Sequence, residues 1–159
     1  MELYRCCFTG HRQLAPATLS LLTAHLDAAL SALYQSGCRH FYAGGALGFD
    51  TLAAERVLAM KKTYADIRLH LLLPCRGQSL GWEAADIARY EAILAGCDTY
   101  QYISEHYYAG AMAKRNQALI AHADVCIAFL QREKSGAGQT VRAAQAAGIP
   151  VINLADRLP

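Results

Sequence analysis

The sequence has little net charge, and it has no apolar segment long enough to cross a membrane. Its formal net charge is +2 over 159 residues, which does not by itself indicate a nucleic-acid-binding protein, although a local pair such as Lys114-Arg115 can form a basic patch. No segment approaches the roughly 20 apolar residues of a membrane span, and the first residues lack the basic-then-apolar layout of a signal peptide. We therefore expect a cytoplasmic protein with no membrane partner.

The six cysteines have the spacing of neither a metal site nor a disulfide framework. They include no C-x-x-C pair, and most lie in apolar segments, where a free thiol behaves as a small buried hydrophobe. We expect reduced structural cysteines and no metal. The sequence also has no internal repeat, low-complexity tract or linker, and 54% of its residues are apolar, so residues 1–159 are expected to form a single globular domain.

Apolar runs alternate with segments of helical periodicity along the whole chain. The runs predict strands at residues 6–8, 40–43, 69–73, 99–103, 125–130 and 149–154. The first helix is predicted from a leucine stripe that ends before Gly37, and the others at residues 51–62, 83–95, 109–123 and 140–147. Continuously apolar strands are covered on both faces, and helical crossovers impose parallel pairing. The sequence therefore predicts an α/β fold with an open, doubly wound, mainly parallel sheet.

A glycine-rich turn stands between the second predicted strand and the helix after it. It reads Gly44-Gly45-Ala46-Leu47-Gly48-Phe49-Asp50-Thr51, with G-G-x-x-G spacing and no P-loop lysine. A strand end, a tight turn and a helix start leave N–H groups unpaired at the positive end of the helix dipole, which suits phosphate. We expect this turn, including Thr51, to bind an anion. Asp50 either caps the helix or accepts a hydrogen bond from a ribose hydroxyl.

Loops after other strands are expected at the same edge, because ligands of such sheets bind beyond the carboxyl ends of the strands. Arg12 offers a planar fork for phosphate or carboxylate, or else pairs with a surface acid. Trp82 either stacks on a base or covers an apolar helix end. The candidate ligand-binding residues of these loops are Thr9, Gly10, His11, Arg12, Trp82, Gly136, Gly138 and Thr140.

Three polar residues on predicted helices complete the candidates. Asn116 falls on an apolar stripe, so its amide must bond to backbone or to a ligand. Arg115 is a candidate beside it, although two adjacent cations commonly form a solvated face. Glu55 lies opposite the apolar stripe of its helix, which is typical of a surface acid.

These motifs, in this order, resemble those of the YpsA-type proteins of the SLOG (Smf/DprA-LOG) superfamily. The resemblance implies a Rossmann-like fold, a pocket for nucleotides or nucleotide-derived molecules, and a link to cell-division control in Gram-positive bacteria. The LOG branch hydrolyses nucleoside monophosphates with a P-G-G-x-G-T-x-x-E motif, and its glutamate position falls on Ala143 here. The resemblance rests on Thr9 to Arg12, Gly44 to Thr51 with Ala54-Glu55, Pro74-Cys75, Gln78, Trp82, Arg115-Asn116 and Gly136 to Val141.

Three functions are compatible with the sequence. The favoured one is a non-catalytic sensor or regulator that binds a nucleotide-type ligand and needs no further cofactor. The second is an N-glycosidase or phosphoribohydrolase, in which Asp50 or Glu55 is the catalytic carboxylate. The third, disfavoured by the charge, is binding of single-stranded DNA through Lys114, Arg115 and aromatic side chains. Homo-oligomerisation is also expected for so small and apolar a domain.

Overall fold

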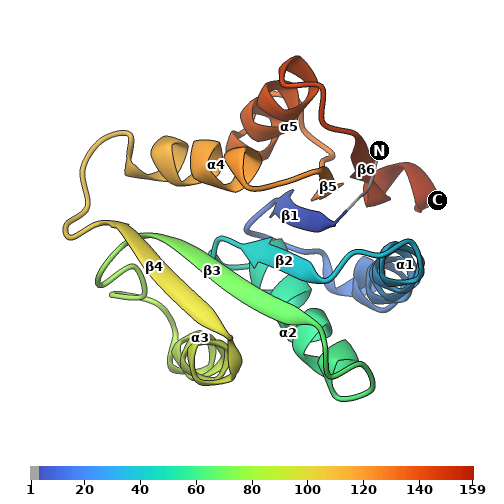
Figure 1. Cartoon of the computed structure of the whole chain (residues 1–159). Helices are drawn as coiled ribbons and strands as arrows, with labels where there is room; N and C mark the ends of the chain where they lie inside the picture. Colours follow the sequence, from blue (N-terminus) through green and yellow to red (C-terminus); the bar gives the residue numbers. More distant parts are fainter. Residues whose placement is uncertain (1–3) are drawn as a thin grey trace.

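The computed structural model describes residues 4–159, which form one parallel sheet with helices on both faces (Figure 1). The strands follow the order β4-β3-β2-β1-β5-β6, and every neighbouring pair is parallel. The strands are β1 (Arg5–Gly10), β2 (His40–Ala43), β3 (Arg68–Cys75), β4 (Thr99–Ser104), β5 (Val125–Phe129) and β6 (Val151–Asn153). The helices are α1 (Pro16–Gln35), α2 (Phe49–Lys61), α3 (Ala84–Gly96), α4 (Ala111–Ala121), α5 (Gly136–Ala146) and the 3-10 helix η1 (Leu154–Arg157).

The two faces of the sheet have separate apolar cores, as the sequence predicts for a doubly wound fold. Helices α1, α2 and α3 pack on one face, and α4 and α5 pack on the other (Figure 1). Successive residues of β1 point to opposite cores, so Phe8 contacts the α1–α3 layer and Cys7 contacts the α4–α5 layer. Five of the six cysteines are buried, as expected of thiols that pack as small hydrophobic side chains.

The topology places a crevice at the carboxyl ends of β1 and β5. From β1 the chain proceeds to β2, β3 and β4 on one side, and then returns to β5 on the other side. The two helices that follow β1 and β5 therefore leave on opposite faces of the sheet (Figure 1). Such a switch in strand order opens a gap between the loops, where ligands of α/β sheets bind.

The start of α5 differs from the prediction. The sequence predicted a helix from residue 140, whereas α5 begins at Gly136. Its N-cap is Ser135, whose Oγ accepts a hydrogen bond from the N–H of Gly138 at 3.0 Å. The cap outweighs the low helix propensity of two glycines in the first turn.

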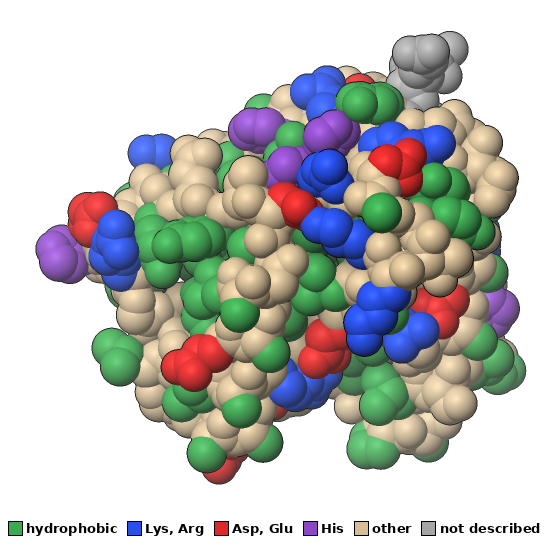
Figure 2. Space-filling view, turned by 60° about the horizontal axis from the view of Figure 1, so that its bottom comes forward, with side chains coloured by type: hydrophobic (Ala, Val, Ile, Leu, Met, Phe, Trp, Pro, Cys, Tyr) green, Lys and Arg blue, Asp and Glu red, His purple; other side chains and the backbone are tan. Residues whose placement is uncertain are grey.

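A group of histidines lies toward the amino ends of the strands, away from the switch-point crevice. His40 Nδ1 is 2.9 Å from His70 Nε2, and His70 Nδ1 is 2.6 Å from the hydroxyl of Thr99. Tyr42 stacks on His70 and lies against His122. Figure 2 shows histidine side chains gathered beside lysine and arginine side chains near the upper edge of the view. Within residues 4–159, no helix combines the length and the apolar character needed to cross a membrane.

Candidate functional site: a cavity at the strand-order switch

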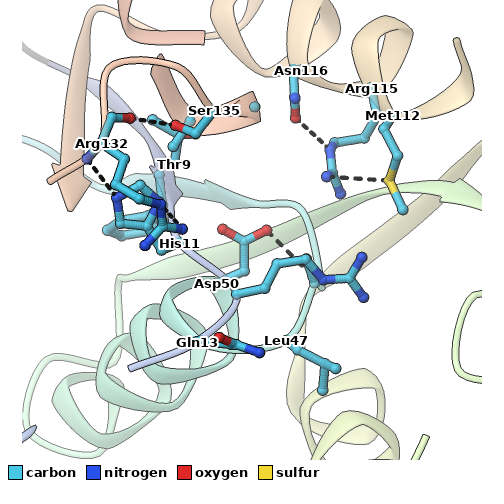
Figure 3. Close-up of a pocket in the computed structure, with 16 residues that line it drawn as sticks. Thr9, His11, Gln13, Leu47, Asp50, Met112, Arg115, Asn116, Arg132 and Ser135 are labelled. Carbon is cyan, nitrogen blue, oxygen red and sulfur yellow. Dashed lines mark hydrogen bonds between the residues drawn. The ribbon is translucent and has the colours of Figure 1, made fainter. Parts of the chain in front are cut away.

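A cavity of about 530 Å³ lies at the carboxyl ends of β1 and β5. Its walls come from four parts of the chain: residues 8–13 after β1, the glycine turn before α2, the first half of α4, and residues 132–137 at the start of α5 (Figure 3). These segments are far apart in sequence, and the parallel sheet brings them together because each follows or faces a strand end.

Asp50 is the buried acid of this cavity. It is 6% exposed, and its Oδ2 accepts a hydrogen bond from the N–H of Ala46 at 3.3 Å. Burial raises the pKa of Asp50, and the positive charge of Arg115 opposes this effect. The N–H of Phe49 donates to the carbonyl oxygen of His11 at 3.0 Å. Two amides that the sequence offered to a ligand anion therefore have acceptors within the protein, which corrects the prediction of an empty amide cradle there.

Arg115 lies inside the molecule, which excludes the alternative that it belongs to a solvated face. Its side chain is buried, whereas the neighbouring Lys114 is exposed. Its Nη1 donates to the carbonyl oxygen of Gly44, and its Nε donates to Oδ1 of Asn116 at 2.8 Å. Burial lowers the pKa of Arg115, and the carboxylate of Asp50 opposes the shift. The partner of the Asn116 amide oxygen is therefore the side chain of Arg115, where the sequence predicted backbone or a ligand, and Asn116 positions a buried guanidinium (Figure 3).

His11 connects the end of β1 to the loop after β5. Its Nε2 accepts hydrogen bonds from the N–H groups of Gln131 at 2.8 Å and of Arg132 at 3.2 Å. Burial, followed by the charge of Arg132, lowers the pKa of His11. The ring is therefore neutral near neutral pH, and its proton lies on Nδ1, which is 3.4 Å from the guanidinium of Arg132. Two hydrogen-bond donors consequently face each other at this wall of the cavity.

Two arginines of the cavity have no acid partner among residues 4–159. Arg12 makes no ion pair or hydrogen bond with these residues, although its positive charge also opposes the rise in the pKa of Asp50, and the side chain of Arg132 has a hydrogen-bonding contact only with His11 among them. Beside Arg132, Ser135 satisfies the N–H of Gly138, and no acceptor within the described chain reaches the N–H groups of Gly136 and Ala137. With Arg115, the cavity has three arginines and one carboxylate, so its local charge is positive.

Eight of the fifteen predicted ligand-binding residues lie together in this cavity. Those that line it are Thr9, Gly10, His11, Arg12, Asp50, Arg115, Asn116 and Gly136. The residues that do not line it are Gly44, Gly45, Gly48, Thr51, Trp82, Gly138 and Thr140, together with the candidate carboxylate Glu55.

The residues outside the cavity have structural partners instead. Trp82 packs edge-on against Tyr90 of α3 at a ring distance of 5.4 Å and lies outside the lining of this cavity. Glu55 forms an ion pair with Arg89 of α3 at 2.6 Å, in agreement with the surface position that periodicity predicted. The hydroxyl of Thr51 donates to the carbonyl oxygen of Ala46 at 2.8 Å.

The glycines outside the cavity allow close approach of other groups. A Cβ on Gly44 would lie within 3 Å of the Arg115 guanidinium and of Asp50, and one on Gly48 would meet the backbone of Arg12. Gly45 has a φ of 72°, and a Cβ at this position would clash with the side chain of Leu73. They shape the site without facing its interior.

The candidate residues did not include eight others that line the cavity: Phe8, Gln13, Ala46, Leu47, Met112, Arg132, Ser135 and Ala137. Arg132 had a usable signal, because it is the first cation after β5, as Arg12 is after β1. Gln13 and Met112 had none, since a single polar or apolar residue near an element end is common in any domain.

The fold and the position of the cavity define a Rossmann-like α/β domain with a site at the strand-order switch. The family model YpsA, described as the YspA SLOG family, matches residues 6–147. The chain therefore belongs to this SLOG family, as its motifs suggested.

Curated proteins that are similar to this chain include UPF0398 proteins. One from Halalkalibacterium halodurans is 31% identical over 107 residues, which cover 66% of this chain and 57% of the relative. Another from Staphylococcus saprophyticus is 26% identical over 118 residues, which cover 73% of this chain and 63% of the relative. The matched part thus spans about three fifths of the length of these relatives.

Solved structures of DNA processing protein A have the same fold. The protein from Helicobacter pylori, studied for its single-stranded DNA binding mode, matches with a TM-score of 0.65 and 24% identity over 94% of this chain and 64% of that chain. The protein from Streptococcus pneumoniae matches with a TM-score of 0.65 and 15% identity over 94% of this chain and 49% of that chain. At these identities the likeness shows the fold alone.

Proposed function

We propose that this domain binds a nucleotide or a nucleotide-derived phosphorylated small molecule in the switch-point cavity, as a non-catalytic sensor or regulator. The observation that carries the proposal is the pair Arg12 and Arg132, which line one cavity and have no acid partner among residues 4–159. A cavity that collects unpaired guanidinium groups favours an anion, and planar guanidinium forks match the oxygens of phosphate.

The start of α5 supports a phosphate at the Arg132 wall. The N–H groups of Gly136 and Ala137 border the cavity, and they lie at the positive end of the helix dipole. The proton on His11 Nδ1 adds a further donor beside Arg132. An oxyanion between these groups would accept hydrogen bonds from donors that otherwise face one another.

The remaining walls suit a nucleoside. A cavity of about 530 Å³ lies within the usual size of small-molecule sites. Leu47 and Met112 supply apolar surface, and the carboxylate of Asp50 is an acceptor suited to a ribose hydroxyl. The positive charge of the walls and this single carboxylate fit a ligand with a phosphate at one end and hydroxyls at the other.

One observation favours hydrolysis as a second candidate. Asp50 is buried at the cavity and its pKa is raised, which is a property of carboxyl groups that act as general acids or bases. The other proposed carboxylate, Glu55, is held by Arg89 outside the cavity. Binding is therefore the function that more of the geometry supports.

The test is calorimetric titration with nucleoside monophosphates and with the matching nucleosides. We expect the monophosphates to bind at least about tenfold more tightly, because a charge-assisted hydrogen bond contributes roughly 1.5–3 kcal/mol. Arg12→Ala should weaken monophosphate binding by about 10- to 100-fold for the same reason. The matched control is Arg68→Ala, which removes a cation at the amino end of β3, away from the cavity. Equal affinities for nucleosides and nucleotides would refute the proposal.

The same samples separate binding from hydrolysis. Release of ribose 5-phosphate is measured after prolonged incubation with each monophosphate. A sensor leaves the nucleotide intact. Turnover that Asp50→Asn abolishes would replace the sensor by a phosphoribohydrolase.

A further inference from the structure

A second cavity adjoins the first one. Neither of the two candidate functions assigns a role to it. It has a volume of about 430 Å³ and lies between the β3–α3 loop and the β4–α4 loop. Arg12 and Met112 line both cavities. The two spaces are therefore neighbours across the side chain of Arg12, which has no acid partner among residues 4–159.

Two large apolar side chains of this second cavity are open to water. Leu80 of the β3–α3 loop is 84% exposed, and Tyr107 of the β4–α4 loop is 70% exposed. Both line the same cavity although they come from different loops. Exposed apolar and aromatic side chains that share a cavity are typical of a binding site, where the ring of a ligand can pack against them.

The loops that carry these side chains are tied to each other and to the first site. Arg76 forms an ion pair with Glu105 at 2.7 Å across the two loops, and its guanidinium lies 4.5 Å from the ring centre of Tyr102. Gln78 donates through Nε2 to the carbonyl oxygen of Gly45 at 3.0 Å, which attaches the β3–α3 loop to the glycine turn. The second cavity is thus a formed part of the same edge of the sheet.

From this arrangement we infer that the ligand has two ring systems joined through phosphate. This inference rests on the proposed function and narrows its ligand class. The linking phosphates extend from the Arg132 wall to Arg12, one nucleoside occupies the rest of the switch-point cavity, and the second ring packs against Leu80 and Tyr107. A mononucleotide would use Arg12 and leave the second apolar surface in water.

The test compares ADP with diadenosine diphosphate, which carry the same number of phosphates and differ by one adenosine. We expect diadenosine diphosphate to bind about tenfold more tightly, since stacking of one base on an aromatic side chain has an effect of this order. Leu80→Ser and Tyr107→Ala should each remove this advantage and leave the affinity for ADP unchanged. Leu21→Ser is the control, because Leu21 is an exposed leucine of α1 that lines neither cavity.

The outcomes separate this inference from the proposed function. If ADP binds and the second adenosine adds nothing, or if the Leu80 and Tyr107 variants weaken both ligands equally, the second subsite is refuted and the first remains. If neither ligand binds, both proposals fail. A ten-nucleotide single strand that binds more tightly than diadenosine diphosphate would overturn the small-molecule ligand in favour of a nucleic-acid track.

Discussion

Two glycines in the first turn of α5 provide a matched pair for testing how the Arg132 loop is held. A Cβ on Gly138 would lie 2.0 Å from the carbonyl oxygen of Glu133, whereas one on Gly136 would have no heavy atom within 4 Å. The Glu133 carbonyl cannot retreat freely, because it accepts a hydrogen bond from Nη1 of Arg142 at 3.0 Å. The same substitution is therefore expected to have opposite effects two residues apart.

The magnitudes follow from these contacts. Forcing a methyl group into packed space costs about 1–3 kcal/mol, which for a domain of this size lowers Tm by roughly 2–10 °C. At Gly136 an alanine meets no atoms and restricts the unfolded chain, so Gly136→Ala should stabilise by about 0.4–1 kcal/mol and raise Tm by roughly 1–4 °C. Gly138→Ala should therefore be the less stable of the two variants.

Thermal unfolding followed by circular dichroism measures both effects. The reasoning is refuted if Gly138→Ala melts at or above the temperature of Gly136→Ala. If the two variants differ as expected, titration with a monophosphate shows whether the displaced loop also alters affinity. We expect weaker binding by Gly138→Ala, because its clash moves the segment that carries Arg132 and the free amides of α5.

Two further predictions concern titrating groups. Burial lowers the pKa of both His40 and His70 below 6.5. The charge of Arg68 adds to this shift at His40, and the charge of His40 adds to it at His70, so the unfolded chain binds protons that the folded chain does not. The free energy of unfolding should therefore be constant above about pH 6.5 and decrease as the pH falls below that value. The prediction is contradicted if Tm does not drop between about pH 7.5 and 5.5, or if it drops equally in the His40→Gln/His70→Gln double variant. Burial raises the pKa of Asp50, so its ionised form at neutral pH costs folding free energy. At about pH 7, Asp50→Asn should melt at the wild-type temperature or above, because its amide oxygen still accepts the Ala46 N–H. Asp50→Ala should lower the free energy of unfolding by about 1–3 kcal/mol. A lower Tm for Asp50→Asn would show that attraction between Asp50 and Arg115 stabilises the fold by more than the burial of the carboxylate costs.

The fold was predictable because its signals are local. Strands in this chain are short continuous apolar runs, and the run at residues 40–43 coincides with β2. The predicted stripe of the first helix is buried at Leu22, Leu26, Ala29, Leu30 and Leu33, whereas Leu19, its first member, is exposed because it lies in the first turn. Parallel pairing then follows from the helical crossovers, so the sheet and the edge that carries the site could be derived without coordinates.

The interior of the site was less predictable, because its partners are distant in sequence. Burial of Arg115 depends on the Gly44 carbonyl, 71 positions away along the chain, and no pattern around Lys114-Arg115 reveals that contact. Local spacing offered the amides of the glycine turn to a ligand, yet Asp50 and the carbonyl of His11 accept two of them. Trp82 had two alternatives of similar merit in the sequence, and its contact with Tyr90, eight positions further along the chain, was not visible in the local pattern.

One residue joins three of the loops around the cavity. The carbonyl oxygen of His11 accepts the N–H at the start of α2, while its ring nitrogen accepts two N–H groups just beyond β5. Through these hydrogen bonds, His11 ties together the loops that follow β1, β2 and β5. A ligand that displaced one of these three loops would therefore also disturb the hydrogen bonds that hold the other two.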